Sequence, residues 1–120
     1  DIAKEYIKNG NVKGVDSKKG SLLHNHAVLN KQHHLIEPLI KDCELKVNRK
    51  NINGHTPLYI AVVNNYERAV EILLANNAHV FLSYKDSKSI LDIAEETGFE
   101  NIVDILKAHI ENLSRVLLKF

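Results

Sequence analysis

The fold of this chain is decided by one stretch of sequence, which reads Thr56-Pro57-Leu58-Tyr59-Ile60-Ala61-Val62-Val63-Asn64-Asn65-Tyr66-Glu67-Arg68-Ala69-Val70-Glu71-Ile72-Leu73-Leu74. Thr56 can cap a helix with its hydroxyl, and Pro57 stands where a missing N–H costs nothing. Apolar residues at 58, 61 and 62 mark one face of a first short helix, and those at 69, 70, 73 and 74 mark a face of a second. Neither helix is long enough to be stable alone in water, so each must bury its apolar face against a neighbour.

The neighbours are supplied by repetition of the same pattern along the chain. Apolar pairs begin at residues 2, 35, 69 and 102, which are 33, 34 and 33 residues apart. The start of the first helix, residues 56–61, recurs as Ser89-Ile90-Leu91-Asp92-Ile93-Ala94 and, less closely, as Ser21-Leu22-Leu23-His24-Asn25-His26. A repeat of this length indicates a stack of similar helical units, in which each unit covers the apolar face of the next.

The repeated unit resembles the ankyrin repeat. The resemblance rests on the period of about 33 residues, on a second helix that ends in Leu-Leu, and on the connector that runs into the first helix. The matching connector residues are Val47, Asn48, Lys50, Gly54, His55, Thr56, Pro57 and Leu58. The resemblance covers nearly the whole chain and implies an all-α solenoid, in which antiparallel helix pairs are joined by β-hairpin fingers.

The repeat predicts a single domain over residues 1–120. Its parts are a leading half-repeat with its finger at 1–20, repeats at 21–49 and 50–82, and a last repeat at 83–120. The apolar stripe of the last helix continues past Lys107, so we expect an extended C-terminal capping helix that folds over or leans against the last repeat. The alternative is a linker helix into another domain. Pro38 falls inside the second helix of the repeat at 21–49, where we expect a kink or a late start.

The composition is that of an ordinary globular chain and argues against several classes of partner. Apolar residues make up 44% of the sequence and charged residues 26%, with a formal net charge of +1. Because the net charge is so small, we expect no nucleic-acid partner. No apolar run approaches the roughly 18 residues of a membrane span, so no membrane insertion is expected. The single cysteine, Cys43, cannot form an internal disulfide, which favours a cytoplasmic location.

The residues that most often carry chemistry do not assemble into a recognisable site. Histidines occur at 24, 26, 33 and 34, but zinc ligands must converge on one point, and we interpret these as structural and surface side chains. Cys43 falls at a helix end, where the dipole disfavours a thiolate. No phosphate-binding loop, hydrolase motif or calcium loop is present. We therefore predict no catalytic residue, no metal site, no cofactor and a non-enzymatic protein.

The resemblance implies a binding surface as well as a fold. Ankyrin repeats bind partner proteins through the finger tips and the outward side of the first helices, which together line a concave face. Carried over position by position, the predicted partner-binding residues are Lys18, Lys19, Val28, Leu29, Lys50, Ile52, Asn53, His55, Val63, Asn64, Ser83, Lys85, Asp86, Lys88, Glu96 and Thr97.

Two features of this set suggest how a partner is held. Val28, Leu29, Ile52 and Val63 have no core role in this register, so they predict an apolar strip for a partner. A register change of one residue would return Val28 or Val63 to the core. Lysines in the fingers could form a basic rim suited to an acidic segment, or could simply keep exposed connectors soluble.

We therefore predict a protein-interaction module that acts in scaffolding, sequestration or targeting. The alternative is the targeting segment of a larger effector, toxin or enzyme whose activity lies outside this chain, and the location would then include the interior of a host cell. The partner is expected to be a protein. The chain itself is expected to be a monomer or to self-associate weakly through an uncovered repeat end.

Overall fold

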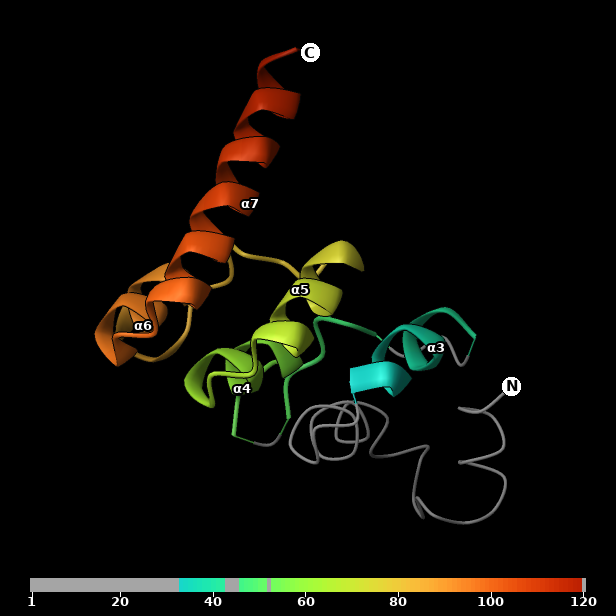
Figure 1. Cartoon of the computed structure of the whole chain (residues 1–120). Coiled ribbons are helices and arrows are strands. Elements are labelled where there is room, and N and C mark those ends of the chain that lie inside the picture. The colour runs from blue at the N-terminus through green and yellow to red at the C-terminus, as the bar shows by residue number, and fades with distance from the viewer. Residues whose placement is uncertain (1–32, 43–45, 52, 120) are drawn as a thin grey trace.

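A computed structural model describes residues 33–42, 46–51 and 53–119 of the chain (Figure 1). The elements in this part are η2 (His33–Leu35), α3 (Ile36–Lys41), α4 (Pro57–Val63), α5 (Glu67–Ala75), η3 (Lys85–Ser87), α6 (Ile90–Thr97) and α7 (Glu100–Leu118). No strand occurs among these residues. The predicted half-repeat at 1–20 and the first helix of the repeat at 21–49 lie outside the described residues.

The helices pack in two layers, as a stack of helix pairs requires. The paired helices α4 and α5 contact each other, and so do α6 and α7. Along the stack, α4 contacts α6, while α5 contacts both α3 and α7. First helices therefore lie beside first helices, and second helices beside second helices, which confirms the predicted all-α solenoid (Figure 1).

The start of each first helix is set by its cap. The Thr56 hydroxyl accepts a hydrogen bond of 3.1 Å from the backbone N–H of Tyr59, and Pro57 occupies the first turn of α4. One unit later, Ser89 and Asp92 form a reciprocal capping box at α6, with both hydrogen bonds at 3.1 Å. The cap predicted at Thr56 is thus confirmed, and its repeat 33 residues on uses different side chains for the same task.

The core lies between the two layers and is built from the apolar positions that repeat. Leu58 and Ala61 of α4 and Val70, Leu73 and Leu74 of α5 are all buried, as the periodicity predicts. The equivalent positions of α6 and α7 are buried as well; they are Ile90, Ile93, Ala94, Ile102 and Leu106. A hydrogen bond of 2.7 Å from the backbone N–H of His79 to Oδ1 of Asn48 joins successive connectors outside this core.

The second helix of the preceding unit begins late, as Pro38 predicts. The chain makes the 3-10 turn η2 where its repeat equivalent α5 is already α-helical, and α3 starts only at Ile36. Pro38 then lies in the first turn of α3, where its missing N–H removes no helical hydrogen bond.

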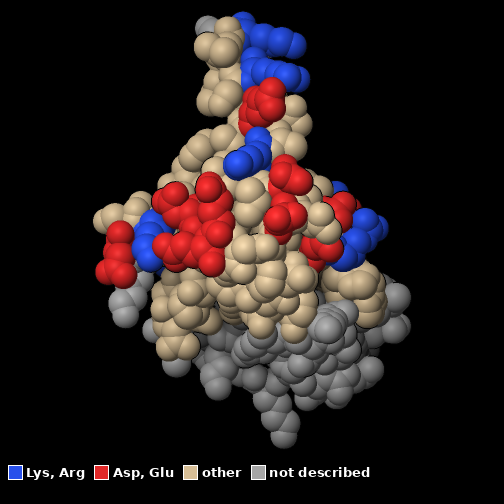
Figure 2. Space-filling view, turned by 60° about the vertical axis from the view of Figure 1, so that its left-hand side comes forward, with Lys and Arg blue, Asp and Glu red and all other residues tan. Residues whose placement is uncertain are grey.

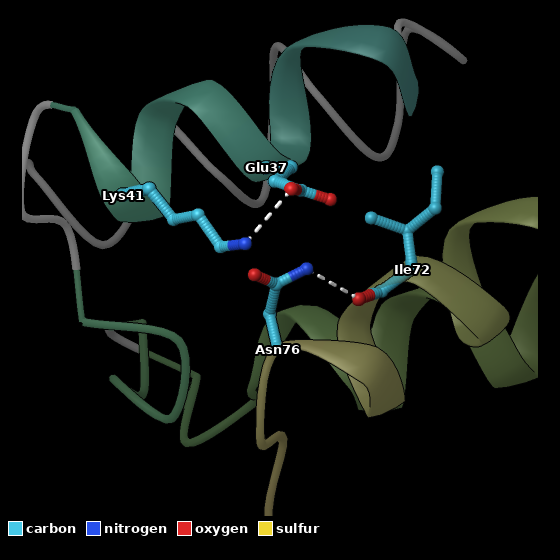
Figure 3. Close-up of polar contacts among 4 residues, drawn as sticks. All are labelled: Glu37, Lys41, Ile72 and Asn76. Atoms are coloured by element: carbon cyan, nitrogen blue, oxygen red, sulfur yellow. Dashed lines mark hydrogen bonds and ion pairs between the residues drawn. The ribbon is translucent and has the colours of Figure 1, made fainter.

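Polar side chains join α3 to the end of α5 (Figure 3). Lys41 Nζ donates a hydrogen bond of 2.9 Å to Glu37 Oε1, and this ion pair holds the pKa of Glu37 below its usual value. The amide of Asn76 faces this pair and donates to the carbonyl of Ile72 at 2.8 Å. A weaker interaction with Asn76 lowers the pKa of Glu37 further. The carbonyl of Ile72 also accepts from the backbone N–H of Asn76 at 3.1 Å, so Asn76 gives it two donors at the helix end while remaining buried.

Helix α7 runs straight past the rest of the stack (Figure 1). Its first half is anchored by Ile102 and Leu106, and Ile110 and Leu113 are half-buried against the core. Beyond them the side chains are exposed, with Leu117 at 70%. The described residues include no helix with the length and apolar character of a membrane span.

Candidate protein-binding groove

The two described fingers close in the same way, although neither forms strands in the described part of the chain. In the first, the Asn51 N–H donates to the His55 carbonyl at 2.9 Å, and the Gly54 N–H donates to the Asn51 carbonyl at 2.9 Å. In the second, the equivalent bonds run from Tyr84 to Lys88 at 2.8 Å and from Ser87 to Tyr84 at 3.0 Å. The expected hairpin fingers are therefore tight turns here.

Both turns need a residue in the left-handed region. Gly54 has a φ of 77°, and its repeat equivalent Ser87 has a φ of 58°. Glycine adopts this conformation without strain, whereas serine does so at a cost. In the second finger Asp86 is also left-handed, with a φ of 63°. These turns fix the direction in which the finger-tip side chains leave the backbone.

Aromatic rings link the first finger to the second. The rings of His55 and Tyr59 stack, with centroids 4.1 Å apart and planes inclined by 18°. The ring of Tyr59 lies 5.2 Å from that of Tyr84 at 33°. The Tyr84 hydroxyl lies 2.7 Å from the Thr56 hydroxyl, and burial raises the pKa of Tyr84. The middle and last units are therefore joined by side chains as well as by core packing.

These elements enclose a groove of about 530 Å³ between the two fingers and the first helices. The side chains and backbone that line it belong to Lys50, Asn53, Gly54, His55, Tyr59, Ser83, Tyr84, Asp86, Lys88, Ile93 and Glu96. Seven of the residues predicted to bind a partner thus come together in one place. Gly54, Tyr59, Tyr84 and Ile93 also line it and were not among the predicted residues. In the repeat that the sequence resembles, a histidine is usual where this chain has Tyr59, and that replacement could have indicated an altered contact there.

The charges of the groove are nearly balanced. Lys88 Nζ lies 2.7 Å from Glu96 Oε1, and the hydrogen bond to Glu96 raises the pKa of Lys88 above its usual value. The carboxylates of Asp86 and Asp92 act on Lys88 in the same direction. In the described part of the last unit, the lysine at position 88 is therefore paired with a carboxylate and does not stand as an isolated basic charge.

Three predicted binding residues lie elsewhere in the described part of the chain. Val63, the last residue of α4, is half-buried and packs against the core, and it does not line the groove. Its role in binding a partner stays a prediction. The side chains of Asn64 and Thr97 donate to carbonyls of their own helices, at 2.8 Å to Ile60 and 2.6 Å to Ala94.

The remaining predicted site residues lie outside the described part. These are Lys18, Lys19, Val28, Leu29 and Ile52, together with the side chain of Lys85. The histidines at 24 and 26 and Cys43 are outside it too. Within the described ranges, no group of three or more His, Cys, Asp or Glu side chains is placed to hold a metal ion, and His33 and His34 are exposed on η2.

Acidic side chains also gather on the surface of the helices. Figure 2 shows Asp and Glu side chains gathered across the middle of the molecule, with Lys and Arg on the projecting end of the chain. The exposed acidic residues of α5 to α7 include Glu71, Glu95, Glu100 and Asp104. They lie on helix surfaces rather than in the groove, where solvated charge is the ordinary condition.

The fold and the groove together define a solenoid of stacked helix pairs with a ligand-sized hollow between its fingers. A family model described as ankyrin repeats (3 copies) matches residues 1–84 and 25–115, and the chain belongs to the ankyrin repeat family. This confirms the resemblance seen in the sequence. Ankyrin repeats generally mediate protein–protein interaction and are typically not enzymes.

Two curated relatives are similar over part of the chain. A protein of Escherichia coli (strain K12), named as the ankyrin repeat protein YahD, is 35% identical over 79 residues, which are 62% of this chain and 39% of that protein. A protein of Arabidopsis thaliana, named as the E3 ubiquitin-protein ligase XBAT34, is 32% identical over 62 residues, 52% of this chain and 16% of that protein. The matched segments thus cover well under half of either relative.

Proposed function

We propose that this chain is a recognition module that binds a partner protein in the groove between its two described fingers. The observation that carries the proposal is the groove itself, which spans two consecutive units and combines aromatic rings with charged side chains. Protein-binding surfaces combine such a partly apolar centre with a polar margin. A scaffolding, sequestering or targeting role follows from binding alone and needs no chemistry in the chain.

The rigidity of the groove supports binding without a large ordering cost. Its walls stand on α4 and α6, which share one core, and the Thr56–Tyr84 hydrogen bond holds the second finger to the cap of the first helix. The stacked pair of His55 and Tyr59 is already in contact before any partner arrives. A preformed surface of this kind loses little conformational entropy when a partner binds.

The test is affinity capture with a matched control. The groove variant His55→Ala/Asp86→Ala alters two groove-lining side chains, and the control Glu71→Ala/Glu111→Ala removes two exposed carboxylates from α5 and α7. We expect partners retained by the wild type and the control, quantified by mass spectrometry, to be lost from the groove variant. Unchanged far-UV circular dichroism is required of both variants. Equal retention by the groove variant and the wild type would contradict binding in the groove.

A second candidate is that the module directs a larger enzyme or effector to its target. The observation that favours it is the match to a plant protein named as an E3 ubiquitin-protein ligase, of which the matched segment covers only 16%. The groove would then choose what the remainder of the protein acts on. Reading the complete coding sequence tests this directly, and a coding sequence that encodes only the repeats would contradict it.

A further inference from the structure

We propose that the groove recognises its partner by seating one basic side chain, an arginine in preference to a lysine, against the wall formed by Asp86 and Glu96. This inference rests on the proposed function, because it names the chemistry that the groove selects. It differs from one of the two alternatives considered for the finger lysines, a basic rim suited to an acidic segment.

The first argument is the charge of that wall. Asp86 and Glu96 line the groove, and Asp92 is close enough to act on Lys88 as well. Lys88 is the one cation that the described last unit contributes to the lining, and the negative charges of Glu96, Asp86 and Asp92 all act on it. The ion pair with Lys88 is made by Oε1 of Glu96. A carboxylate has two oxygens and about four acceptor positions, so Glu96 can accept a second cation without releasing the first.

The second argument is what an acidic side chain would have to do at the same wall. Lys88 is already paired with Glu96 at 2.7 Å, so an acidic side chain that bound another N–H of Lys88 would lie next to the carboxylate of Glu96. Asp86 and Asp92, whose charges also act on Lys88, would repel it as well. Like charges placed together in this way disfavour a complex, whereas an incoming cation adds attraction to all three. Lys50 lies on the opposite wall. Because Lys50 is positively charged, an acidic or neutral partner residue suits that wall better than a basic one.

The third argument is the aromatic lining, which distinguishes arginine from lysine. Tyr59 and Tyr84 line the groove together with His55, and the centroids of successive rings lie 4.1 Å and 5.2 Å apart along the wall. A guanidinium group is flat, stacks on aromatic rings and binds a carboxylate through two parallel hydrogen bonds. An ammonium group is not flat, so it can neither stack on a ring nor bind a carboxylate through two parallel hydrogen bonds in one plane. The combination of rings and carboxylates therefore favours arginine.

The test uses three short capped peptides that differ at one position, Gly-Gly-Xaa-Gly-Gly with arginine, citrulline or glutamate at Xaa. Nuclear magnetic resonance titrations of the whole chain follow the ring signals of Tyr59 and Tyr84. We expect saturable shifts with the arginine peptide, and binding about two- to fivefold weaker with the uncharged citrulline peptide, the range of an exposed cation contact. Saturation of these signals by the glutamate peptide but not by the arginine peptide would overturn the proposal.

A pair of variants gives the sharper result, because the two halves of one ion pair should act in opposite directions. Glu96→Gln removes an acceptor and leaves Lys88 less neutralised, so affinity for the arginine peptide should fall. Lys88→Gln removes the cation that is paired with Glu96, so the affinity for the arginine peptide should rise by about two- to fivefold. Glu111→Gln, on the far part of α7, should change nothing. If both groove variants weaken binding alike, the pair is only structural and the proposal fails.

The outcome is separable from that of the proposed function. Peptides bear on the chemistry of one wall, whereas the capture experiment with His55→Ala/Asp86→Ala bears on whether the groove binds a protein at all. If a partner is captured through the groove but the arginine peptide does not bind, the proposed function stands and the proposal that the groove binds a basic side chain is overturned.

Discussion

The hydroxyl of Thr56 lies 2.7 Å from the hydroxyl of Tyr84, so the cap of one helix and the finger of the next unit share a hydrogen bond. Thr56 is almost fully buried, and its oxygen also accepts from the N–H of Tyr59 at 3.1 Å. One side chain thus starts a helix and joins two units, which makes the groove wall part of the structure that holds the stack together.

Replacing Tyr84 with phenylalanine removes this inter-unit bond and keeps the ring. We expect the free energy of unfolding to fall by about 1 kcal/mol, the net value of a partly buried hydrogen bond, measured by urea denaturation. Tyr59→Phe is the matched control, because Tyr59 contributes to the groove through its ring contacts with His55 and Tyr84. An equal loss in both variants would show that the Thr56–Tyr84 bond has no particular role.

The same tyrosine predicts a pH dependence. Burial raises the pKa of Tyr84 above its usual value of 10.0, so the folded state holds this proton more tightly than the unfolded state. The resulting stability is fully present below pH 10.0 and is lost as the pH rises through the higher folded-state pKa. The urea concentration at the midpoint of unfolding should therefore decrease when the pH is raised from below 10.0 to above the folded-state pKa, and it should decrease more for the wild type than for Tyr84→Phe. Parallel curves for the two proteins would contradict the assignment.

Two leucines of α7 should respond very differently to the same substitution. Leu106 is 0% exposed and Leu117 is 70% exposed. Leu106→Ala opens a cavity in the core and should cost about 2–5 kcal/mol, while Leu117→Ala should change stability by less than about 0.5 kcal/mol. Thermal and urea unfolding measure both values. A large loss from Leu117→Ala would mean that the projecting end of α7 packs against something in solution.

The end of α6 offers a test of backbone conformation. Gly98 has a φ of 77°, and a Cβ atom at this position would meet no other atom within 4 Å, so only the backbone resists substitution. Its repeat equivalent is Asn65, which adopts a φ of 58°. Gly98→Ala should therefore cost about 1 kcal/mol, and Gly98→Asn clearly less, because asparagine tolerates the left-handed region. Chemical denaturation of both variants checks the order, and the reverse order would exclude the backbone explanation.

The stack was predictable because its signals are local or periodic. The cap at Thr56, the late helix caused by Pro38 and the buried faces that include Leu58 and Leu73 all follow from residue type and spacing, and each is present in the structure. The position of Val63 was harder to predict, because it stands at a helix end, where a small rotation decides between surface and core, and the structure leaves it half-buried.

The groove was predictable only as a set of positions. Lys50 and His55 were expected at one finger, and Lys88 and Glu96 at the next unit, but the sequence does not show that Lys88 pairs with Glu96 or that Tyr59 lies beside Tyr84. Charge signs counted along the fingers suggested a basic rim, whereas the carboxylates that face Lys88 come from a helix as well as from a finger.

By itself, the sequence determined that this chain is a stack of short helix pairs, because a short helix with one apolar face is not stable alone in water and must bury that face against its repeated neighbour. Its resemblance to the ankyrin repeat then gave the type of stack. Only the tertiary structure decided what the binding groove is made of. The Thr56–Tyr84 hydrogen bond joins two units, and the Lys88–Glu96 ion pair joins a finger to a helix of the same unit, so both distances depend on how separate elements pack.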